Sequence, residues 1–169
     1  MIIVITGGNG FLGSNLAKKF LNKGHKVYIF DKSKNKFSLI NKNAHQVSCD
    51  LTNYKTLENL KINKVDLILH CAGQPSAALS FKHPELDLNV NILGTLNILR
   101  WAKTKNVKKI LFASTFNVYE ENNFKPRLSE NDNCKAKSLY AVSKIASENY
   151  IQCYANHYNL SWVILRMFN

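Results

Sequence analysis

Short apolar runs alternate along this chain with longer segments whose apolar positions recur at helical spacing. The runs are four or five residues long and lie between polar or glycine-rich stretches, as buried strands do. This pattern predicts strands over residues 2–6, 26–30, 45–48, 67–71, 109–113 and 162–165. It predicts helices near residues 11–22, 54–60, 85–103 and 139–158.

The alternation of strands and helices indicates the fold class. In the first helical segment, Leu12, Leu16 and Phe20 recur every four residues and mark one apolar face. Short apolar strands separated by such helices predict an α/β protein, with a doubly wound parallel sheet and helices on both faces. A ligand of such a sheet lies beyond the carboxyl ends of its strands. The polar stretch 122–137 is predicted to be a loop after the fifth strand.

Composition places the chain among globular proteins. Its 169 residues, 46% hydrophobic and 20% charged, are enough for one domain spanning residues 1–169 with a sizeable core. No stretch approaches the length of a membrane span, and we expect a cytoplasmic protein. The four cysteines form no C-x-x-C pair, so no metal site is expected.

The formal net charge of +12 comes mostly from lysines spread through many segments. They form no dense block with interleaved aromatic residues, and no nucleic-acid recognition motif accompanies them. We therefore expect no nucleic acid as partner. A basic surface does raise the encounter rate with anionic substrates, which is the interpretation we favour.

Glycines 7, 10 and 13 lie between the first strand and the first helix, in the sequence Thr6-Gly-Gly-Asn-Gly-Phe-Leu-Gly13. In this context Gly7 permits a tight turn, Gly10 lets the backbone approach a pyrophosphate, and Gly13 lets the helix pack closely on the strand. The helix N-terminus then offers N–H groups and a partial positive charge to the phosphates. The segment predicts a dinucleotide site.

Asp31 follows the second strand and indicates which dinucleotide binds. A carboxylate there can accept hydrogen bonds from the adenosine ribose and repels a 2′-phosphate, so NAD is favoured over NADP. Lys32 keeps NADP open as an alternative, because a lysine can meet a 2′-phosphate.

A second group of residues points to proton transfer. Tyr140 and Lys144 lie four residues apart, on one face of the predicted last helix. A free tyrosine has a pKa of about 10, and a nearby ammonium group, together with the positive nicotinamide ring of oxidised NAD, is expected to favour the phenolate and lower that pKa. The pair could then remove a proton from a sugar hydroxyl. Thr115, at the end of the fifth strand, could hydrogen-bond the reacting oxygen.

Six motifs extend over the whole chain: T-G-G-x-G-F-L-G, H-C-A-G-Q, N-x-x-G-T, S-T-x-x-V-Y, Y-x-x-x-K and L-R-M-F-N. With them the chain resembles the extended short-chain dehydrogenases/reductases of the NAD-dependent epimerase/dehydratase family, which act on nucleotide sugars. The resemblance implies a Rossmann fold, NAD as cofactor and a nucleotide-diphosphate sugar as substrate.

The resemblance also implies a role for each matching residue. The pyrophosphate would be held by backbone at Gly7, Gly10, Phe11, Leu12 and Gly13. Asp31 would bind the adenosine ribose; Asp50 and Leu51 would line the adenine pocket; Ala72 and Gly73 would run beside the cofactor. Asn91 would brace the sheet near the active site; Thr115, Tyr140 and Lys144 would be the catalytic set, with Lys144 also on the nicotinamide ribose.

Departures from the family pattern shape the functional expectation. Phe116 and Asn117 stand where 4,6-dehydratases have an Asp-Glu pair, which argues against dehydration, and Glu120 replaces a usual glycine. We expect an epimerase-type enzyme. A reductase or dehydratase of the same family and a non-catalytic NAD-binding module are the alternatives. Gln74-Pro75-Ser76 weakly resembles the CDP-sugar 2-epimerase branch.

Length is the largest departure, because family members continue for ~150 further residues, about one domain. We expect a truncated form, a fragment or one half of a split gene, without the last sheet strand and the substrate-binding domain. Such a chain is expected to bind NAD with little or no sugar-nucleotide activity. Its last strand would expose an apolar sheet edge, so we expect either a homodimer or a complementary C-terminal polypeptide as partner.

Overall fold

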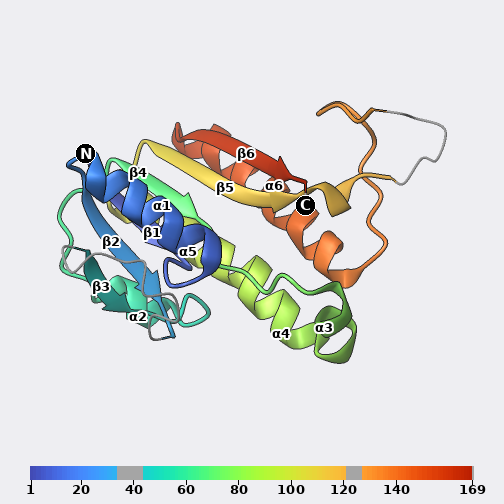
Figure 1. The fold of residues 1–169 in the computed structure, drawn as a ribbon, viewed down its shortest axis with the longest axis horizontal. Helices are drawn as coiled ribbons and strands as arrows, with labels where there is room; N and C mark the ends of the chain where they lie inside the picture. The colour runs from blue at the N-terminus through green and yellow to red at the C-terminus, as the bar shows by residue number, and fades with distance from the viewer. Residues whose placement is uncertain (34–43, 121–126, 169) are drawn as a thin grey trace.

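The computed structural model describes residues 1–33, 44–120 and 127–168. Its strands are β1 (Ile2–Thr6), β2 (Lys26–Asp31), β3 (His45–Ser48), β4 (Leu67–His70), β5 (Lys109–Thr115) and β6 (Ser161–Met167). They form one sheet in the order β3-β2-β1-β4-β5-β6, with every neighbouring pair parallel (Figure 1). The order reverses between β1 and β4, which places a topological switch point at the carboxyl ends of these two strands.

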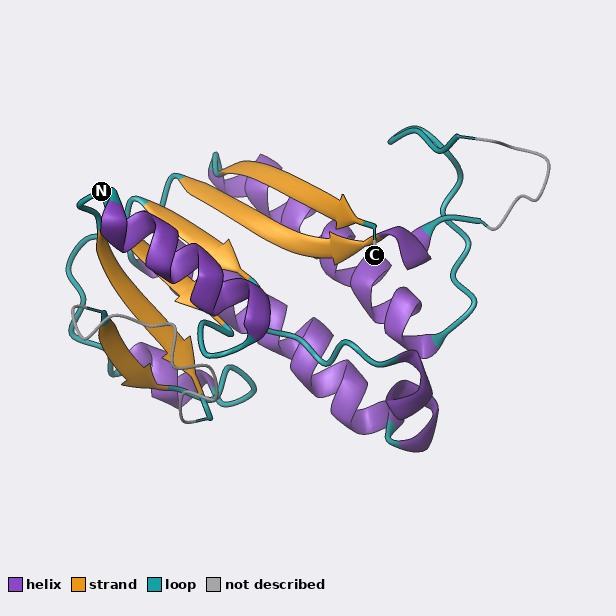
Figure 2. Cartoon of the chain, viewed as in Figure 1, coloured by secondary structure: helices purple, strands orange, loops and turns teal. Residues whose placement is uncertain are grey.

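Helices cover both faces of the sheet (Figure 2). They are α1 (Phe11–Asn22), α2 (Tyr54–Glu58), α3 (Ala77–Lys82), α4 (Pro84–Asp87), α5 (Gly94–Thr104) and α6 (Leu139–Tyr158). A π-helical turn, η1 (Leu88–Leu93), joins α4 to α5, and a 3-10 turn, η2 (Phe116–Val118), follows β5. Together with the all-parallel sheet, this is the doubly wound Rossmann arrangement that the alternation predicts.

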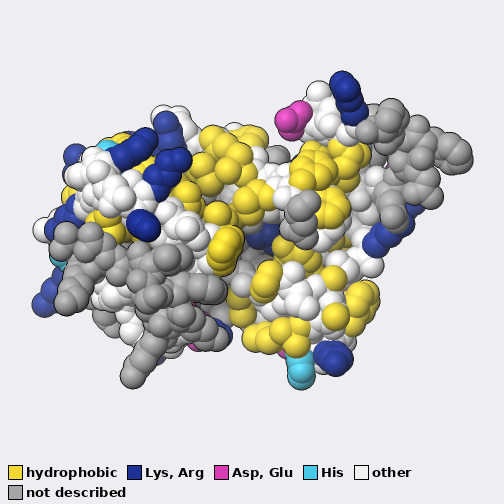
Figure 3. Space-filling model, in the orientation of Figure 1, with side chains coloured by type: hydrophobic (Ala, Val, Ile, Leu, Met, Phe, Trp, Pro, Cys, Tyr) yellow, Lys and Arg dark blue, Asp and Glu magenta, His cyan; other side chains and the backbone are white. Residues whose placement is uncertain are grey.

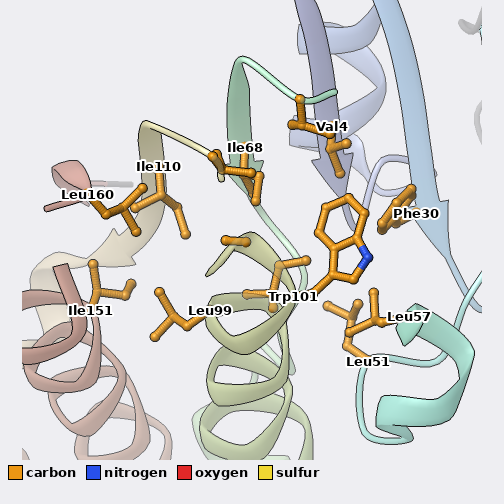
Figure 4. Close-up of a cluster of buried hydrophobic side chains, with 14 of the residues drawn as sticks. Val4, Phe30, Leu51, Leu57, Ile68, Leu99, Trp101, Ile110, Ile151 and Leu160 are labelled. Carbon is orange, nitrogen blue, oxygen red and sulfur yellow. The ribbon is translucent and has the colours of Figure 1, made fainter. Parts of the chain in front are cut away.

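Alternate residues of the strands feed two separate cores, as expected when successive side chains point to opposite faces. The larger core joins Val4, Phe30 and Ile68 of the sheet to Trp101 of α5 and Ile151 of α6 (Figure 4). The Trp101 and Phe30 rings meet edge to face, with centroids 5.2 Å apart. The smaller core lies under α1 and includes strand residues 3, 5, 27, 29 and 69.

Strand β6 is much less covered than the strands at the centre of the sheet. On β6, Val163 is 44% exposed and Leu165 43%, whereas the central β1 residues Ile3 and Val4 are fully buried. Hydrophobic side chains gather on the surface over β5 and β6 in Figure 3. The outer strand of the described sheet therefore presents apolar surface, as the sequence predicts for this edge.

The predicted elements match the structure with small shifts, except in one region. The helix expected over 85–103 is three consecutive segments, α4, η1 and α5, and the preceding α3 was not predicted. Part of the predicted 122–137 loop, 122–126, lies outside the described residues. The rest contains no helix. Its Cys134 forms an antiparallel bridge with Tyr119, the residue after η2. No helix within the described ranges is long and apolar enough to cross a membrane.

Candidate active site

The glycine-rich turn between β1 and α1 is too crowded for side chains. Gly7 has a φ of +63°, and a Cβ there would lie 2.7 Å from the backbone of Ala72 after β4. A Cβ on Gly13 would lie 2.4 Å from the Gly7 carbonyl oxygen, and one on Gly10 3.2 Å from the same atom. The turn therefore brings β1, β4 and the start of α1 into direct backbone contact, which leaves a cradle that backbone groups line.

A cavity of about 280 Å³ opens beside this turn, at the carboxyl ends of β1 to β4. Seven of the predicted cofactor residues line it: Gly7, Gly10, Asp31, Asp50, Leu51, Ala72 and Gly73. Lining residues that the sequence analysis did not assign to the cofactor include Asn9, Ser33, Thr52 and Val90. The position at the switch point is where an open α/β sheet binds its ligand.

Two carboxylates shape the walls of this cavity. Asp31 accepts hydrogen bonds from the backbone N–H of Asn9 (3.0 Å) and from the N–H and hydroxyl of Ser33 (2.9 and 2.8 Å). Asp50 accepts the N–H and hydroxyl of Thr52 in the same way. Asp31 thereby ties the end of β2 to the glycine-rich turn, and its position beside the cavity fits a ribose contact.

The remaining predicted cofactor residues do not line the cavity. Phe11 is 72% exposed at the start of α1, and Leu12 follows it in the first helical turn. Asn91 is 3% exposed and its side chain is engaged within the protein. Its Oδ1 accepts the N–H of Gln74 (2.8 Å), and its Nδ2 donates to the Ser143 hydroxyl (2.9 Å). Asn91 therefore ties the loop after β4 to α6, and its bracing role stays a prediction.

The predicted catalytic residues converge where β5 ends and α6 begins. Ser138 caps α6 by accepting the N–H of Ala141 (3.1 Å), which sets Tyr140 in the first turn. Tyr140 is buried, and the Thr115 side chain lies near enough to its phenol to lower the pKa of that group. The Thr115 hydroxyl accepts the N–H of Asn117 and so starts η2. The structure therefore brings Thr115 and Tyr140 close together.

Lys144 lies on the next turn of α6 and is 5% exposed. Its Nζ donates to the carbonyl oxygen of Ala113 (2.6 Å) and lies 4.0 Å from the centre of the Phe112 ring. The same atom is 4.0 Å from where a Cβ on Gly73 would be, so it lies next to one of the residues that line the cofactor cavity. Burial lowers the pKa of this ammonium group to about 8, against the opposing pull of Cys71, Glu148 and Asp87.

One electrostatic expectation is wrong for the protein alone. Burial raises the pKa of Tyr140, and the nearby negative charge of Asp87 raises it further, while the Thr115 hydrogen bond lowers it. Lys144 does not lower it, because the ammonium group is directed toward Ala113 and the cavity rather than the phenol. The protein by itself holds Tyr140 as a protonated hydroxyl.

His70 ends β4 directly behind the site and is fully buried. Its Nδ1 lies 2.6 Å from the Thr6 hydroxyl and its Nε2 lies 3.0 Å from the Thr95 hydroxyl. Burial, with the positive charge of Lys144, lowers the pKa of His70 to about 3. A neutral imidazole therefore links β1, β4 and α5, and it has no free nitrogen for proton transfer.

The site includes buried polar residues that sequence reasoning missed. Asp87, Gln74 and Ser143 all contact Asn91, and each is at most 6% exposed. The available signal was weak: Asp87 lies four residues before Asn91, on the same side of a helix, and Ser143 lies inside the Y-x-x-x-K motif. Within the described residues, no group of three His, Cys, Asp or Glu side chains could hold a metal ion.

These features, a Rossmann sheet with a glycine cradle and a Thr-Tyr-Lys set, define a short-chain dehydrogenase/reductase type of site. The model of the NAD dependent epimerase/dehydratase family matches residues 3–169, and the chain belongs to this family. Its similarity to a putative UDP-glucose 4-epimerase of Methanocaldococcus jannaschii is 34% identity, over 99% of this chain and 55% of that protein. A CDP-paratose 2-epimerase of Salmonella typhi is 31% identical, over 98% of this chain and 56% of its own length.

Solved structures agree with this assignment. The UDP-glucose 4-epimerase of Thermus thermophilus, crystallised with NAD, matches with a TM-score of 0.90 and 33% identity, over 98% of this chain and 54% of that one. The UDP-glucose 4-epimerase of Thermotoga maritima, crystallised with UDP-glucose, matches with a TM-score of 0.92 and 31% identity, over 98% of this chain and 55% of that one. The chain thus spans about half the length of the relatives it matches.

Proposed function

We propose that this chain is the NAD-binding and proton-transferring part of a nucleotide-sugar epimerase. The cavity at the switch point supports NAD, because its floor is a glycine turn that leaves no room for side chains and its wall carries Asp31. Asn9, which also lines the cavity, has a buried Oδ1 that bonds to none of the described residues, as an acceptor awaiting a ligand donor would. The relatives crystallised with NAD and with UDP-glucose support the same assignment.

In this proposal the chain's own residues bind, orient and transfer a proton. Backbone around Gly7 to Gly13 holds the pyrophosphate, Asp31 binds the adenosine ribose, and Asp50 with Leu51 lines the adenine pocket. When bound, NAD supplies the hydride acceptor at a sugar carbon. Tyr140 takes the proton from the hydroxyl oxygen on that carbon, with Thr115 hydrogen-bonded to the same oxygen, and returns the proton when the hydride returns.

Lys144 is assigned two tasks in the same step. From its buried position it can reach the ribose next to the nicotinamide, because its Nζ lies near Gly73, which lines the cavity. Its positive charge, moved from the Ala113 carbonyl toward the site, would also stabilise the phenolate of Tyr140. The protein alone keeps Tyr140 protonated, so the base would be generated only when the cofactor is in place.

The close approach of two buried hydroxyl residues, Thr115 and Tyr140, is the observation that carries the enzymatic assignment, because the Thr115 side chain lies near enough to lower the pKa of the Tyr140 phenol. It brings the end of β5 to the start of α6, where both hydroxyls can meet one substrate oxygen. Phe116 and Asn117 follow Thr115, so no acidic pair stands there to assist dehydration. A nucleotide-sugar reductase would use the same residues. A non-catalytic NAD-binding module is the alternative if turnover is absent.

Replacing Tyr140 by phenylalanine tests the proposal. Turnover of UDP-glucose, UDP-galactose and a CDP-sugar would be measured in the chain and in any longer polypeptide that carries it, with NAD affinity measured by calorimetry. Removing the acid/base hydroxyl is expected to reduce turnover by about 100-fold to 10,000-fold and to leave NAD affinity nearly unchanged.

Tyr150→Phe is the matched control, because Tyr150 is an exposed tyrosine on the same helix. Its turnover should equal that of the unmodified protein. Unchanged turnover in Tyr140→Phe would contradict the catalytic assignment. NAD binding without turnover of any nucleotide sugar would favour the NAD-binding module instead.

A further inference from the structure

A buried carboxylate stands at the point where α4 becomes the π-helical turn η1. Asp87 is the last residue of α4 and is 2% exposed. A carboxylate is rarely buried so completely unless its oxygens are paired, because removing it from water is costly. The mechanism proposed above does not use it, so its partners show what it does.

The Oδ1 of Asp87 accepts two amide hydrogen bonds, from the Nε2 of Gln74 (2.8 Å) and the Nδ2 of Asn91 (3.1 Å). Gln74 belongs to the loop after β4, directly behind the cavity residues Ala72 and Gly73. Its side chain also bonds Ser76 at both the N–H and the carbonyl oxygen, which closes the loop on itself. Asp87 therefore holds this loop against η1.

From Asn91 the contacts continue to the catalytic helix. Its Nδ2 donates to the hydroxyl of Ser143 (2.9 Å), and that hydroxyl donates to the carbonyl oxygen of Tyr140 (2.8 Å). The hydroxyl of Ser147 donates to the carbonyl oxygen of Asn91 (2.9 Å), which fixes η1 on α6 a second time. A continuous path of buried hydrogen bonds thus joins Asp87 to the backbone of Tyr140.

The charge of Asp87 acts on the same residues. It lies close enough to raise the pKa of both Tyr140 and Lys144, as a buried anion does for any neighbouring proton carrier. It therefore favours the protonated hydroxyl and the charged ammonium group, and part of the penalty for burying Lys144 is offset. A π-helical turn that interrupts a helix is frequently found at functional sites. Here η1 carries Asn91, which bonds Asp87 on one side and Ser143 on the other.

We propose that Asp87 is a positioning residue of the active site: through Gln74, Asn91 and Ser143 it fixes the cavity loop and the Tyr140 turn together. The role of Tyr140 in this proposal rests on the proposed function. The contacts and the charge effect do not, and they can be measured without turnover.

Asp87→Asn tests the charge, because the amide has nearly the same shape and one oxygen that still accepts hydrogen bonds. The titration of Tyr140 is read as tyrosinate absorbance, from the difference between each protein and its Tyr140→Phe counterpart. With the charge removed, the Tyr140 midpoint is expected to fall, because a nearby anion no longer favours the protonated hydroxyl. Glu85→Gln, an exposed carboxylate two residues earlier, is the matched control and should leave the midpoint in place.

Ser143→Ala tests the hydrogen-bonded path and keeps Asp87 charged. Amide hydrogen exchange at residues 141–144 is expected to accelerate in Ser143→Ala and in Asp87→Asn, but not in Glu85→Gln. This second variant also keeps the proposal testable if Asp87→Asn does not fold.

An unmoved Tyr140 midpoint in folded Asp87→Asn would overturn the charge role. Unchanged exchange in Ser143→Ala would overturn the path. Failure of the proposed function has a different signature, namely full turnover in Tyr140→Phe, so the two outcomes cannot be confused.

Discussion

The cofactor side and the catalytic side of this site are built by different means. At the ends of β1 and β4 the wall is largely backbone: Gly7 and Ala72 approach so closely that no Cβ fits between them. Where β5 ends and α6 begins the wall is side chains: Thr115, Tyr140 and Lys144 are buried together there, and a network of buried hydrogen bonds lies behind them. The first region depends on the absence of side chains, the second on their pairing.

This difference matters for how each region responds to change. A backbone cradle fails by steric overlap, which acts at all pH values and cannot be relieved by a neighbouring side chain's rotation. A buried polar network fails by losing a partner or a charge, and its contribution to stability therefore depends on pH. Substitutions on the two sides should differ in kind as well as in size.

The largest effect is expected from Gly7→Val, which attacks the backbone side. Its φ of +63° is unfavourable for a β-branched residue, and the new Cβ would overlap the backbone of Ala72 at 2.7 Å. Strain and overlap together should lower the free energy of unfolding by roughly 4 kcal/mol, measured by denaturant unfolding, and abolish NAD binding.

Gly24→Val is the control for the same backbone strain without the overlap. Gly24 has a φ of +76°, but a Cβ there meets nothing within 4 Å. It should lose about 1–2 kcal/mol and keep its NAD affinity. If both variants lost the same stability and both bound NAD, the close approach of β1 to β4 would not be what forms the cradle.

A pH-dependent effect is expected on the catalytic side, from Lys144→Met. The folded pKa of Lys144 is about 8, below its ordinary value of 10.5, so the unfolded chain binds more protons between these two values. The penalty of the buried ammonium group is complete below about pH 8 and disappears as the pH rises toward 10.5. The stability advantage of Lys144→Met over the unmodified protein should therefore be on the order of 3 kcal/mol larger at neutral pH than at pH 10.5.

Urea unfolding across this range measures the difference. Because the Tyr140 phenol titrates at alkaline pH, the comparison is repeated with both proteins carrying Tyr140→Phe. Parallel stability curves for the two proteins would show that Lys144 is not held in a desolvated position. The network would then be looser than its hydrogen bonds indicate.

The two sides also differ in how much the sequence predicts. Glycines at positions 7 and 13 indicate the backbone geometry directly, since a Cβ at either position would overlap neighbouring backbone. The six strands and α1 follow from apolar periodicity. The predicted cavity residues Asp31, Asp50, Ala72 and Gly73 all line the cavity, because each ends a parallel strand or lies within three residues after one. Neighbouring strand ends meet at one edge of the sheet, so sequence order is enough to bring them together.

The network behind Tyr140 was not predictable in the same way. Gln74, Asp87, Asn91 and Ser143 come from a loop, two kinds of helix and α6, and no periodic signal relates them. The predicted helix over 85–103 hid the π-helical turn, because a π-helical turn has no pattern of its own in apolar periodicity. The ammonium group of Lys144 was expected beside the phenol, yet burial and the Ala113 carbonyl oxygen determine its direction.

The smallest effect is expected from Asp31→Ala. This variant sharpens the comparison between the two regions, because Asp31 contributes a side chain to the cofactor region, whose wall is otherwise largely backbone. Its carboxylate bonds Asn9 and Ser33, so its removal should loosen the turn slightly. Its larger effect concerns the cofactor: with the negative charge gone, a 2′-phosphate is no longer repelled. We expect the preference for NAD over NADP to narrow by about 10-fold, or ~1.4 kcal/mol, in calorimetric titrations of both cofactors.

Lys32→Ala is the converse variant, since Lys32 lines the same cavity with the opposite charge. It should leave NAD affinity unchanged and weaken NADP further, because an ammonium group near the 2′ position attracts only a phosphate. If Asp31→Ala kept the original preference while Lys32→Ala changed it, the selection would rest on Lys32, and Asp31 would serve only to hold the turn. If neither variant changed the preference between NAD and NADP, the shape of the backbone alone would determine it. The cofactor region would then depend on backbone and the catalytic region on side chains, without exception.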